Sequence, residues 1–154
     1  MKLDKNDLRI IELLNQDARC SYTTMAKDLG ITSTAVQQRV KRLFDDGIIK
    51  KSTIVLNYEA LGYKLLCYIG IYVIAGKYTY SVGEALQDVP EITLANFTTG
   101  AFAIICRVRL KDPAHLKKVL KQIQDIEGVQ RTETLMSFEE IKNKRDDILS
   151  ELES

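Results

Sequence analysis

Apolar residues recur every three or four positions between residues 33 and 46 of the chain. They fall on one stripe of a helical projection, and this predicts an amphipathic helix with the stripe packed inward. Thr32 or Ser33 offers a capping hydroxyl at the start of this helix, and Gly47 follows its end. The stripe consists of Val36, Val40, Leu43 and Phe44.

Two further helices are predicted before this one. Ser21 can cap a short helix that runs to Leu29, and Gly30 can adopt the positive φ that ends it. Asp4 can cap an earlier helix from about Lys5 to Gln16. The buried stripe of that first helix is formed by Leu8, Ile10, Ile11, Leu13 and Leu14. Three helices with a tight turn between the last two predict a helix-turn-helix.

A small wing is expected directly after the third helix. Residues 48–51 and 53–56 can form two short strands, and Lys50 and Lys51 would then lie near a duplex backbone. The segment from Asn57 to Tyr63 connects this unit to the rest of the chain. The predicted boundaries are a helix-turn-helix domain at 1–51, a connector at 52–63, a second domain at 64–140 and a charged tail or short helix at 141–154.

The side of the third helix opposite its apolar stripe carries hydrogen-bonding side chains. Gln can pair with adenine edges and Arg or Lys with guanine, while Ser and Thr reach bases or phosphates. A solvated polar face is the alternative, but the preceding short helix and turn favour DNA contact. Arg39, on the flank, suits a structural ion pair as well as a DNA contact. The predicted DNA-binding residues are Tyr22, Ser33, Thr34, Gln37, Gln38, Lys41, Arg42, Lys50 and Lys51.

The distribution of charge supports this assignment. The chain of 154 residues has a net charge of only +1. Residues 1–51 nevertheless contain ten Lys and Arg against seven Asp and Glu, whereas residues 52–154 contain twelve against fourteen. The basic excess therefore lies in the part of the chain where phosphate contact would need it.

The second part of the chain alternates strand and helix patterns. Thr99-Gly100 has the length and chemistry of a hairpin turn between two of its strands, and Pro90 stops the first helix. The order βαββαβ predicts an α+β fold of the ferredoxin-like type, with both helices on one face of a four-stranded antiparallel sheet. The expected elements are strands at 65–74, 92–98, 101–110 and 129–138, and helices at 80–89 and from Asp112-Pro113 to near Gly128.

One face of this sheet would remain uncovered by helices. Alternation along the third strand places Phe102, Ile104, Cys106, Val108 and Leu110 on a common face. Either Ile69 with Ile71 or Tyr68 with Tyr72 would lie on the open face in a monomer. Pairing two sheets face to face would bury those side chains, so we expect a homodimer through the regulatory domain.

Other chemistries find little support in the sequence. Cys20, Cys67 and Cys106 are widely spaced and odd in number, which favours reduced thiols and no metal site. His115 is the only histidine and is expected to be a solvated residue on a surface helix. No catalytic set or cofactor motif is recognised. The charged N-terminus is unlike a secretory signal and no membrane-spanning segment is recognised, so a cytoplasmic protein is expected.

Several motifs in order resemble the Lrp/AsnC family of leucine-responsive, or feast/famine, transcriptional regulators. The motifs are LDKNDLRIIELLNQDAR, MAKDLGITSTAVQQRVKRLFDDGIIK, LGY, TTGAFAIICRVRLKD and GVQRTETLMSF. The resemblance implies a winged helix-turn-helix, a ligand-sensing domain, dimers that assemble into octamers or related forms, and an amino-acid effector held between dimers. It also implies effector-binding residues at Thr98, Thr99, Gly100, Ala101, Phe102, Thr132, Glu133 and Thr134.

The chain departs from the family pattern at the effector loop. Members commonly have Gly-Xaa-Tyr-Asp, whereas this chain has Gly100-Ala101-Phe102-Ala103. We therefore expect a small apolar or aromatic amino acid, with backbone amides near Gly100 holding its carboxylate and Glu133 or Thr134 meeting its ammonium. The main interpretation is a sequence-specific, effector-modulated regulator of transcription that binds double-stranded DNA. The alternatives are an architectural DNA-bridging protein without effector and a sirohaem-decarboxylase-like enzyme.

Overall fold

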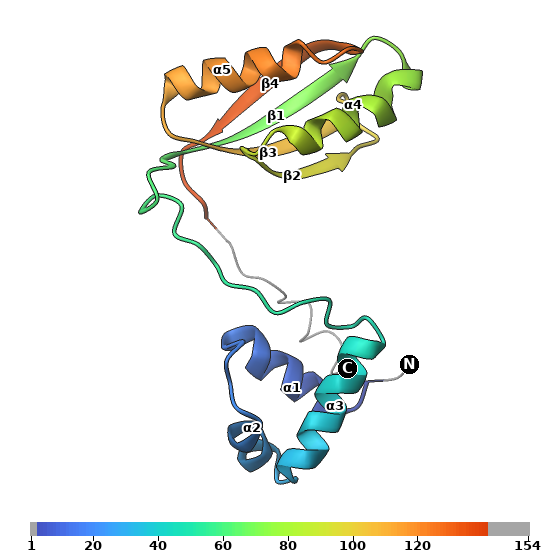
Figure 1. The fold of residues 1–154 in the computed structure, drawn as a ribbon, viewed down its shortest axis with the longest axis vertical. Helices are drawn as coiled ribbons and strands as arrows, with labels where there is room; N and C mark the ends of the chain where they lie inside the picture. The colour runs from blue at the N-terminus through green and yellow to red at the C-terminus, as the bar shows by residue number, and fades with distance from the viewer. Residues whose placement is uncertain (1–2, 142–154) are drawn as a thin grey trace. The chain divides into compact units, whose positions relative to one another are not determined.

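The computed structural model describes residues 3–141 of the chain. By their contacts these residues form two compact units, residues 3–55 and residues 56–141. The first unit contains three helices, α1 (Lys5–Gln16), α2 (Tyr22–Leu29) and α3 (Ser33–Asp45) (Figure 1). The order and type of these elements agree with the helix-turn-helix predicted from the sequence.

The predicted caps of these helices are present. The Asp4 carboxylate accepts from the Asp7 N–H, and the Asp7 carboxylate accepts from the Asp4 N–H in return, which forms a complete capping box. Ser21 and Thr32 accept in the same way at the starts of α2 and α3. Gly30 ends α2 with φ at 66°, a left-handed conformation that a side chain would strain.

The first unit has a small apolar core between its helices. Its centre is formed by four side chains that are 0% exposed, those of Ile10, Met25, Val36 and Leu43. Phe44 was expected on the same stripe, but its side chain is 38% exposed. The reason is its position at the edge of the stripe. The side chain of Leu43 fills the space beneath α3 instead.

The predicted wing is absent, and this corrects the sequence analysis. After α3, Gly47 takes a φ of 73° and the Ile49 N–H donates to the carbonyl of Leu43. Residues 48–56, all of them described, contain no strand, and Ile54 and Val55 are more than 70% exposed. Two four-residue strands without a third strand or an apolar surface beneath them are too few to be stable.

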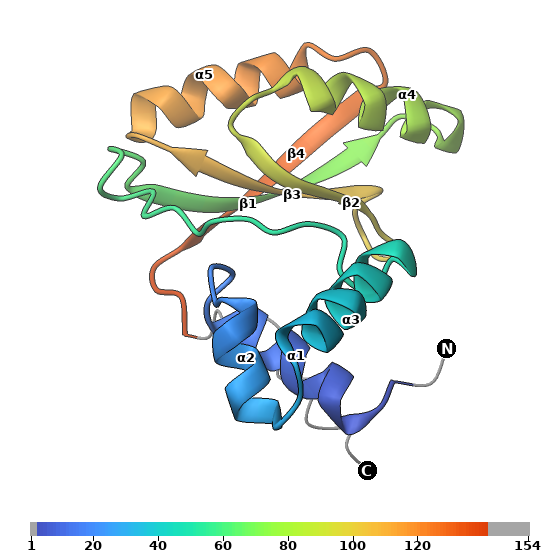
Figure 2. The same cartoon turned by 60° about the horizontal axis from the view of Figure 1, so that its bottom comes forward.

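The second unit is a four-stranded antiparallel sheet with strand order β2-β3-β1-β4. Helices α4 and α5 both cover the same face of this sheet (Figure 2). The predicted ferredoxin-like topology is therefore confirmed. The elements are β1 (Leu65–Val73), α4 (Thr79–Ala85), β2 (Ile92–Phe97), β3 (Ile104–Leu110), α5 (Pro113–Gln124) and β4 (Val129–Ser137), with 3-10 turns at Gly76–Tyr78 and Leu86–Asp88.

The core of the second unit lies between the sheet and its helices. Ile69 and Ile71 of β1 face the helices and are fully buried, so Tyr68 and Tyr72 lie on the open face. This settles the alternative that the sequence left undecided. The core also contains Cys67, Ile104, Cys106, Val108 and Leu110 of the sheet and Val82, Leu86, Val119 and Ile123 of the helical layer.

The connection between β2 and β3 is longer than predicted. β2 ends at Phe97 and β3 begins at Ile104, so six residues replace the expected two-residue turn at Thr99-Gly100. Thr98 joins the two ends of this connection. Its N–H donates to the carbonyl of Ala103, and its hydroxyl donates to the carbonyl of Phe102 at a distance of 2.5 Å. Phe102 therefore lies outside the strand and does not share the core face of β3.

Candidate DNA interface and effector loop

Helix α3 presents a polar face on the surface of the first unit. Ser33, Thr34, Gln37, Gln38 and Lys41 are all exposed on this helix. Among the described residues, no hydrogen bond or ion pair engages the amides of Gln37 and Gln38. Both amides are therefore available to base edges, where a Gln amide can donate and accept at once.

A polar cluster around Asp7 fixes α3 against the start of α1. The Asp7 carboxylate is 1% exposed and accepts from Arg39 Nη1 at 2.8 Å and from Arg42 Nη2 at 2.6 Å. Arg39 also donates to Asp4 at 2.7 Å. Of the two roles that the sequence left open for Arg39, the structure shows the ion pair. Arg42, which the sequence predicts to read bases, donates to Asp7 through Nη2, because the buried carboxylate requires cationic donors, and its side chain is 46% exposed.

The contact between Arg39 and Asp4 favours the ionised form of both groups. The hydrogen bond from Arg39 holds the pKa of Asp4 below its usual value, and the same bond raises the pKa of Arg39. A second pair joins α1 to α2, where Arg9 Nε donates to Asp28 at 2.8 Å and lowers the pKa of that carboxyl. Ion pairs therefore link α1 and its N-cap to α3, and α1 to α2.

Three further predicted DNA-binding residues lie near the ends of the helices. Tyr22 opens α2 and is 40% exposed, and Lys50 and Lys51 follow α3 in an exposed segment. Lys41 is also exposed, but its ammonium pairs with Asp45 at 2.5 Å, and this hydrogen bond raises the pKa of Lys41. Asp45 therefore reduces the charge that Lys41 presents to a phosphate.

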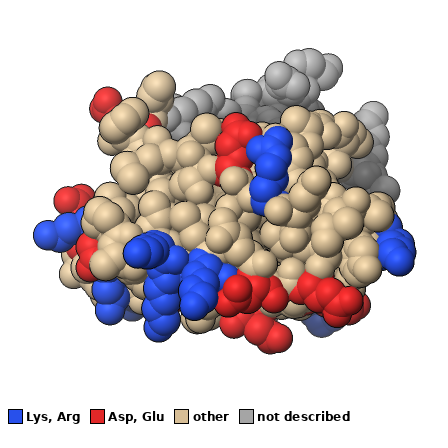
Figure 3. Space-filling model, turned by 90° about the horizontal axis from the view of Figure 1, so that it is seen from above, with Lys and Arg blue, Asp and Glu red and all other residues tan. Residues whose placement is uncertain are grey.

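The surface seen from above in Figure 3 has a different character. Uncharged residues cover most of this face, basic and acidic side chains occur along its lower border, and an acidic and a basic side chain lie next to each other within the uncharged area. A DNA backbone attracts an extended surface of one positive sign. The predicted phosphate contacts Tyr22, Lys50 and Lys51 are exposed residues of α2 and of the segment after α3.

The predicted effector loop, residues 98–103, packs against the open face of the sheet. The Phe102 ring covers Gly70, where an added Cβ would lie only 2.3 Å from Phe102 Cδ1. Phe102 also contacts the Tyr72 ring edge to face, with centroids 5.5 Å apart. Thr99, Gly100 and Ala101 are partly or fully at the surface of this loop. A glycine at position 70 is thus what admits the ring.

Glu133 joins Phe102 on the same face. It pairs with Gly70 across the β1 and β4 strands, and its carboxylate accepts from the Tyr72 hydroxyl at 3.1 Å. The Arg131 guanidinium lies 3.4 Å from the centre of the Tyr72 ring and 3.8 Å from Glu133. A carboxylate, a guanidinium and two aromatic rings therefore meet beside the loop.

The two remaining predicted effector residues do not join this cluster. Thr132 and Thr134 pair with Ile71 and Ile69, so their side chains lie on the helix face of the sheet. Thr132 Oγ1 accepts from Gln124 Nε2 at 3.0 Å. Sequence analysis in turn missed Tyr72 and Arg131. Alternation along β4 places Arg131 on the same face as Glu133 and was the signal that could have identified it.

His115 is not the solvated residue that the sequence suggested. Its side chain is 16% exposed, its Nε2 lies 2.8 Å from Glu91 Oε1, and its Nδ1 accepts from the Lys111 N–H at 3.3 Å. Burial is the largest single influence and acts to raise the pKa of Glu91, but the bond to His115, a backbone hydrogen bond and the charges of His115 and Lys118 together hold that pKa below its usual value. The pair ties the start of α5 to the start of β2.

Other functional groups are absent from the part of the chain that the structure describes. Residues 3–141 contain no cluster of three His, Cys, Asp or Glu side chains placed to hold a metal ion. No helix in this range combines the length and the apolar character needed to cross a bilayer. Burial raises the pKa of the Cys106 thiol to about 11 and also raises that of Cys67, which makes both thiols poor nucleophiles.

Comparisons with known proteins agree with this arrangement. Residues 3–50 match the model of a winged helix-turn-helix DNA-binding domain, and residues 66–147 match that of the Lrp/AsnC ligand-binding domain. The helix-turn-helix and the sheet domain together define a DNA-binding transcriptional regulator with a separate ligand-binding domain. The chain belongs to the Lrp/AsnC family, as the order of its sequence motifs indicated.

Relatives and solved structures resemble the chain over most of its length. The regulator FL11 of Pyrococcus furiosus is 39% identical, covering 87% of this chain and 88% of its own. The regulatory protein AsnC of Haemophilus influenzae is 35% identical, and the match covers 89% of this chain and 92% of that protein. The structure of E. coli AsnC has a TM-score of 0.90 at 32% identity, and the match covers 94% of this chain and 97% of that chain. The regulator NMB0573 of Neisseria meningitidis shares the fold, with a TM-score of 0.87 at 22% identity over 92% and 94%.

Proposed function

We propose that this regulator reads specific DNA sequences with the polar face of α3. The observation that carries the proposal is the combination of unengaged amides on Gln37 and Gln38 with a helix fixed in place by Asp7. Base discrimination requires donors and acceptors that are both available and well positioned. Exposed amides on a helix held at two points meet both requirements.

The predicted contact residues then divide by role. Ser33, Thr34, Gln37 and Gln38 would contact bases, or phosphates at the start of the helix. Lys41, Tyr22, Lys50 and Lys51 would contact the backbone, where charge and hydroxyl donors fix the register. Arg42 moves from the base-reading group to a positioning role, because its guanidinium is engaged by Asp7.

We also propose that two copies pair through the open faces of their sheets. Leu66, Tyr68 and Tyr72 line this face on β1, and Leu135 of β4 is 52% exposed beside them. An apolar surface of this kind is more stable when covered. A twofold dimer would present two α3 helices to half-sites about 34 Å apart or a multiple of that distance. Octamers or related assemblies, as in the family, would build on this dimer.

The proposed effector site lies beside the 98–103 loop and takes an amino acid. Arg131 and the backbone amides near Gly100 would meet its carboxylate, Glu133 its ammonium, and Phe102 its apolar side chain. The fold-related NMB0573 regulator is described as a complex with L-Met. An effector that binds one arrangement of dimers more tightly would shift the population toward it and alter DNA binding. The protein would act in the cytoplasm, where bacterial and archaeal DNA lies.

The base-reading assignment is tested by substitution after selection of a preferred operator from random DNA. Gln38→Ala is expected to lower the preference for one or two base pairs by about tenfold, since each bidentate contact contributes about 1–3 kcal/mol of discrimination. Gln122→Ala, at an exposed position of α5, is the matched control and should change nothing. If the Gln38→Ala variant kept the same operator preference, the assignment of α3 as the helix that recognises bases would be contradicted.

The backbone assignment has a different signature. The double variant Lys50→Ala, Lys51→Ala is expected to weaken binding to every DNA sequence and to lower the slope of affinity against salt by roughly two, one for each lost phosphate contact. The control is Lys117→Ala, Lys118→Ala on the exposed surface of α5. A fall in affinity for one operator only, with an unchanged salt slope, would contradict the assignment.

The effector assignment is tested by calorimetry with all twenty amino acids. We expect one or a few apolar or aromatic amino acids to bind and Glu133→Gln to abolish the heat, because the ammonium loses its counter-charge. Glu127→Gln, in the exposed turn before β4, is the control. The altered loop also favours a second candidate, an architectural DNA-binding protein without effector. Absence of heat for every amino acid, with DNA binding and assembly unchanged across the panel, would favour that candidate.

A further inference from the structure

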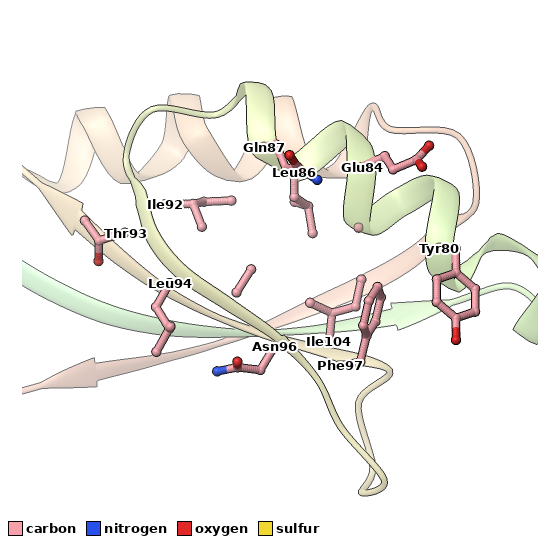
Figure 4. Close-up of a pocket in the computed structure, with 12 residues that line it drawn as sticks. Tyr80, Glu84, Leu86, Gln87, Ile92, Thr93, Leu94, Asn96, Phe97 and Ile104 are labelled. Atoms are coloured by element: carbon pink, nitrogen blue, oxygen red, sulfur yellow. The ribbon is translucent and has the colours of Figure 1, made fainter. Parts of the chain in front are cut away.

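A second cavity lies on the other side of the sheet from Phe102 and Glu133. It is formed between α4 and the edge strand β2 and has a volume of about 540 Å³ (Figure 4). Drug-sized ligands occupy cavities of about 300–1,000 Å³. Leu86 and Ile104, both 1% exposed, form its floor, so the cavity opens directly onto the core of the regulatory domain.

One wall of the cavity is aromatic. The rings of Phe97 and Tyr80 lie 5.1 Å apart and are 54% and 75% exposed. Gly83 of α4 makes this wall possible, since a Cβ at that position would lie only 2.7 Å from Phe97 Cζ. The Phe97 ring therefore packs directly against the helix backbone. Exposed aromatic faces on a fixed support suit a flat or branched apolar group, and they also attract a cation.

The polar groups around the cavity have a one-sided character. Glu84 is the only charged side chain among its lining residues, and in Figure 4 its side chain extends from α4 on the side of Tyr80. The other polar residues that line the cavity are neutral, namely Tyr80, Gln87, Thr93 and Asn96. A carboxylate or phosphate would therefore meet an acidic rim, whereas an ammonium would find both a carboxylate and aromatic faces.

The free edge of β2 adds hydrogen-bond acceptors. The Thr98 N–H points to β3, where it donates to Ala103. Backbone groups alternate in direction along an antiparallel strand, so those of Ala95 and Phe97 point away from β3 toward the unpaired edge. Their carbonyls can accept from an ammonium that has already approached Glu84.

We propose that the cavity between α4 and β2 binds a small organic amine with an aromatic or branched apolar body and no carboxylate. The body lies on Leu86, Ile104 and the Phe97 ring, and the ammonium lies between Glu84 and Tyr80. This site is separate from the amino-acid site proposed beside Glu133, and it does not depend on that site. It would allow the regulatory domain to sense a second class of molecule.

The test is calorimetry on the full chain with 2-phenylethylamine as the probe. We expect binding of one molecule per chain, no detectable heat with phenylacetate, and weaker binding of phenylalanine, whose carboxylate adds repulsion beside Glu84. Glu84→Gln should raise the dissociation constant of 2-phenylethylamine by about fivefold, the upper end for an exposed ion pair. Glu133→Gln, the variant used for the amino-acid site, should leave this constant unchanged.

A second variant tests the position of the apolar body. Ala95 is exposed and lines the cavity, so Ala95→Leu fills the space without disturbing a buried residue, and binding should weaken by about tenfold or more. Ala114→Leu, at an exposed position of α5, is the matched control. The proposal is overturned by absence of heat at millimolar amine, by full binding in the Ala95 variant, or by loss of binding in the Glu133 variant.

Discussion

The two units of the chain hold their helices by different means. In the first unit a buried carboxylate, Asp7, receives two guanidinium groups from α3, and Arg9 joins α1 to α2 through Asp28. In the second unit the helices rest on the sheet through a core of buried aliphatic and cysteine side chains, and no charged residue lies in that core. Both units therefore have an apolar core, and among the described residues the DNA-binding unit adds a buried charged side chain, Asp7, that contacts a neighbouring helix.

The difference follows from size and task. A unit of about fifty residues buries a smaller fraction of its surface than a larger one, so its apolar core is limited. A buried ion pair contributes little net stability, because desolvation offsets most of its Coulomb energy, but its geometry is specific. Asp7 therefore sets the orientation of α3 more than it sets the stability of the unit. The sheet domain needs no such device, since β-sheet pairing already fixes its register.

The largest predicted effect concerns the apolar core of the regulatory unit. Ile69→Ala is expected to destabilise that unit by about 3–4 kcal/mol, because it removes a fully buried side chain and leaves a cavity. Hydrogen exchange measured by mass spectrometry should show faster exchange in peptides of residues 64–138 and no change in residues 3–55. Ile69→Val is the graded control and should cost about 1 kcal/mol. Equal loss of protection in both units would show that they unfold together.

A smaller effect is predicted for the charged cluster of the first unit. Asp7→Asn keeps the shape of the side chain but leaves Arg39 and Arg42 without their common counter-charge. We expect a loss of about 2 kcal/mol in residues 3–55, below the range for a fully buried pair, because the side chains of Arg39 and Arg42 are 26% and 46% exposed. Operator affinity should fall as well, since α3 loses its anchor.

The control for Asp7 is the exposed ion pair of the same unit. Asp28→Asn removes the partner of Arg9, whose side chain is 41% exposed, so solvent screens this pair and we expect a smaller loss of stability than for Asp7→Asn. Operator affinity should remain close to that of the original chain. If Asp28→Asn weakened DNA binding as much as Asp7→Asn, the special role of the buried carboxylate would be refuted.

Many features of both units could be predicted from the sequence, because residues close together in the chain determine them. Asp4, Ser21 and Thr32 cap helices through contacts within three residues, and Gly30 ends α2 by its own conformation. Strand alternation likewise predicted the buried face of β3. Arg39 could be assigned to an ion pair because its flank position was visible on a helical projection. Short-range chemistry of this kind carries its own signal.

The errors arose where distant residues decide the outcome. Arg42 contacts Asp7, 35 positions away, and no local pattern reveals that its guanidinium is engaged. Phe102 continues the alternation of β3 in the sequence, yet its ring lies on Gly70 of another strand, where the missing side chain makes room. The two predicted wing strands are absent for a related reason. Two short strands need an apolar surface to pack against, and the local sequence does not show whether such a surface lies beneath them. Long-range packing overrode propensity in each case.

The smallest predicted effect concerns the stability of the first unit at acid pH. It distinguishes the charge of Asp4 from the role of Asp4 as a helix cap. The folded-state pKa of Asp4 lies below its usual value because Arg39 donates to it, so the stability from this bond is present above about pH 4 and is lost as pH falls through the lowered pKa. Asp4→Asn keeps the N-cap but removes the charge. The Asp4 side chain is 52% exposed, so we expect less than about 0.5 kcal/mol at pH 7, and a flatter decline between pH 4 and pH 2 for residues 3–55 only. An acid decline as steep as in the original chain would show that the Arg39–Asp4 contact does not carry the pH dependence of the first unit.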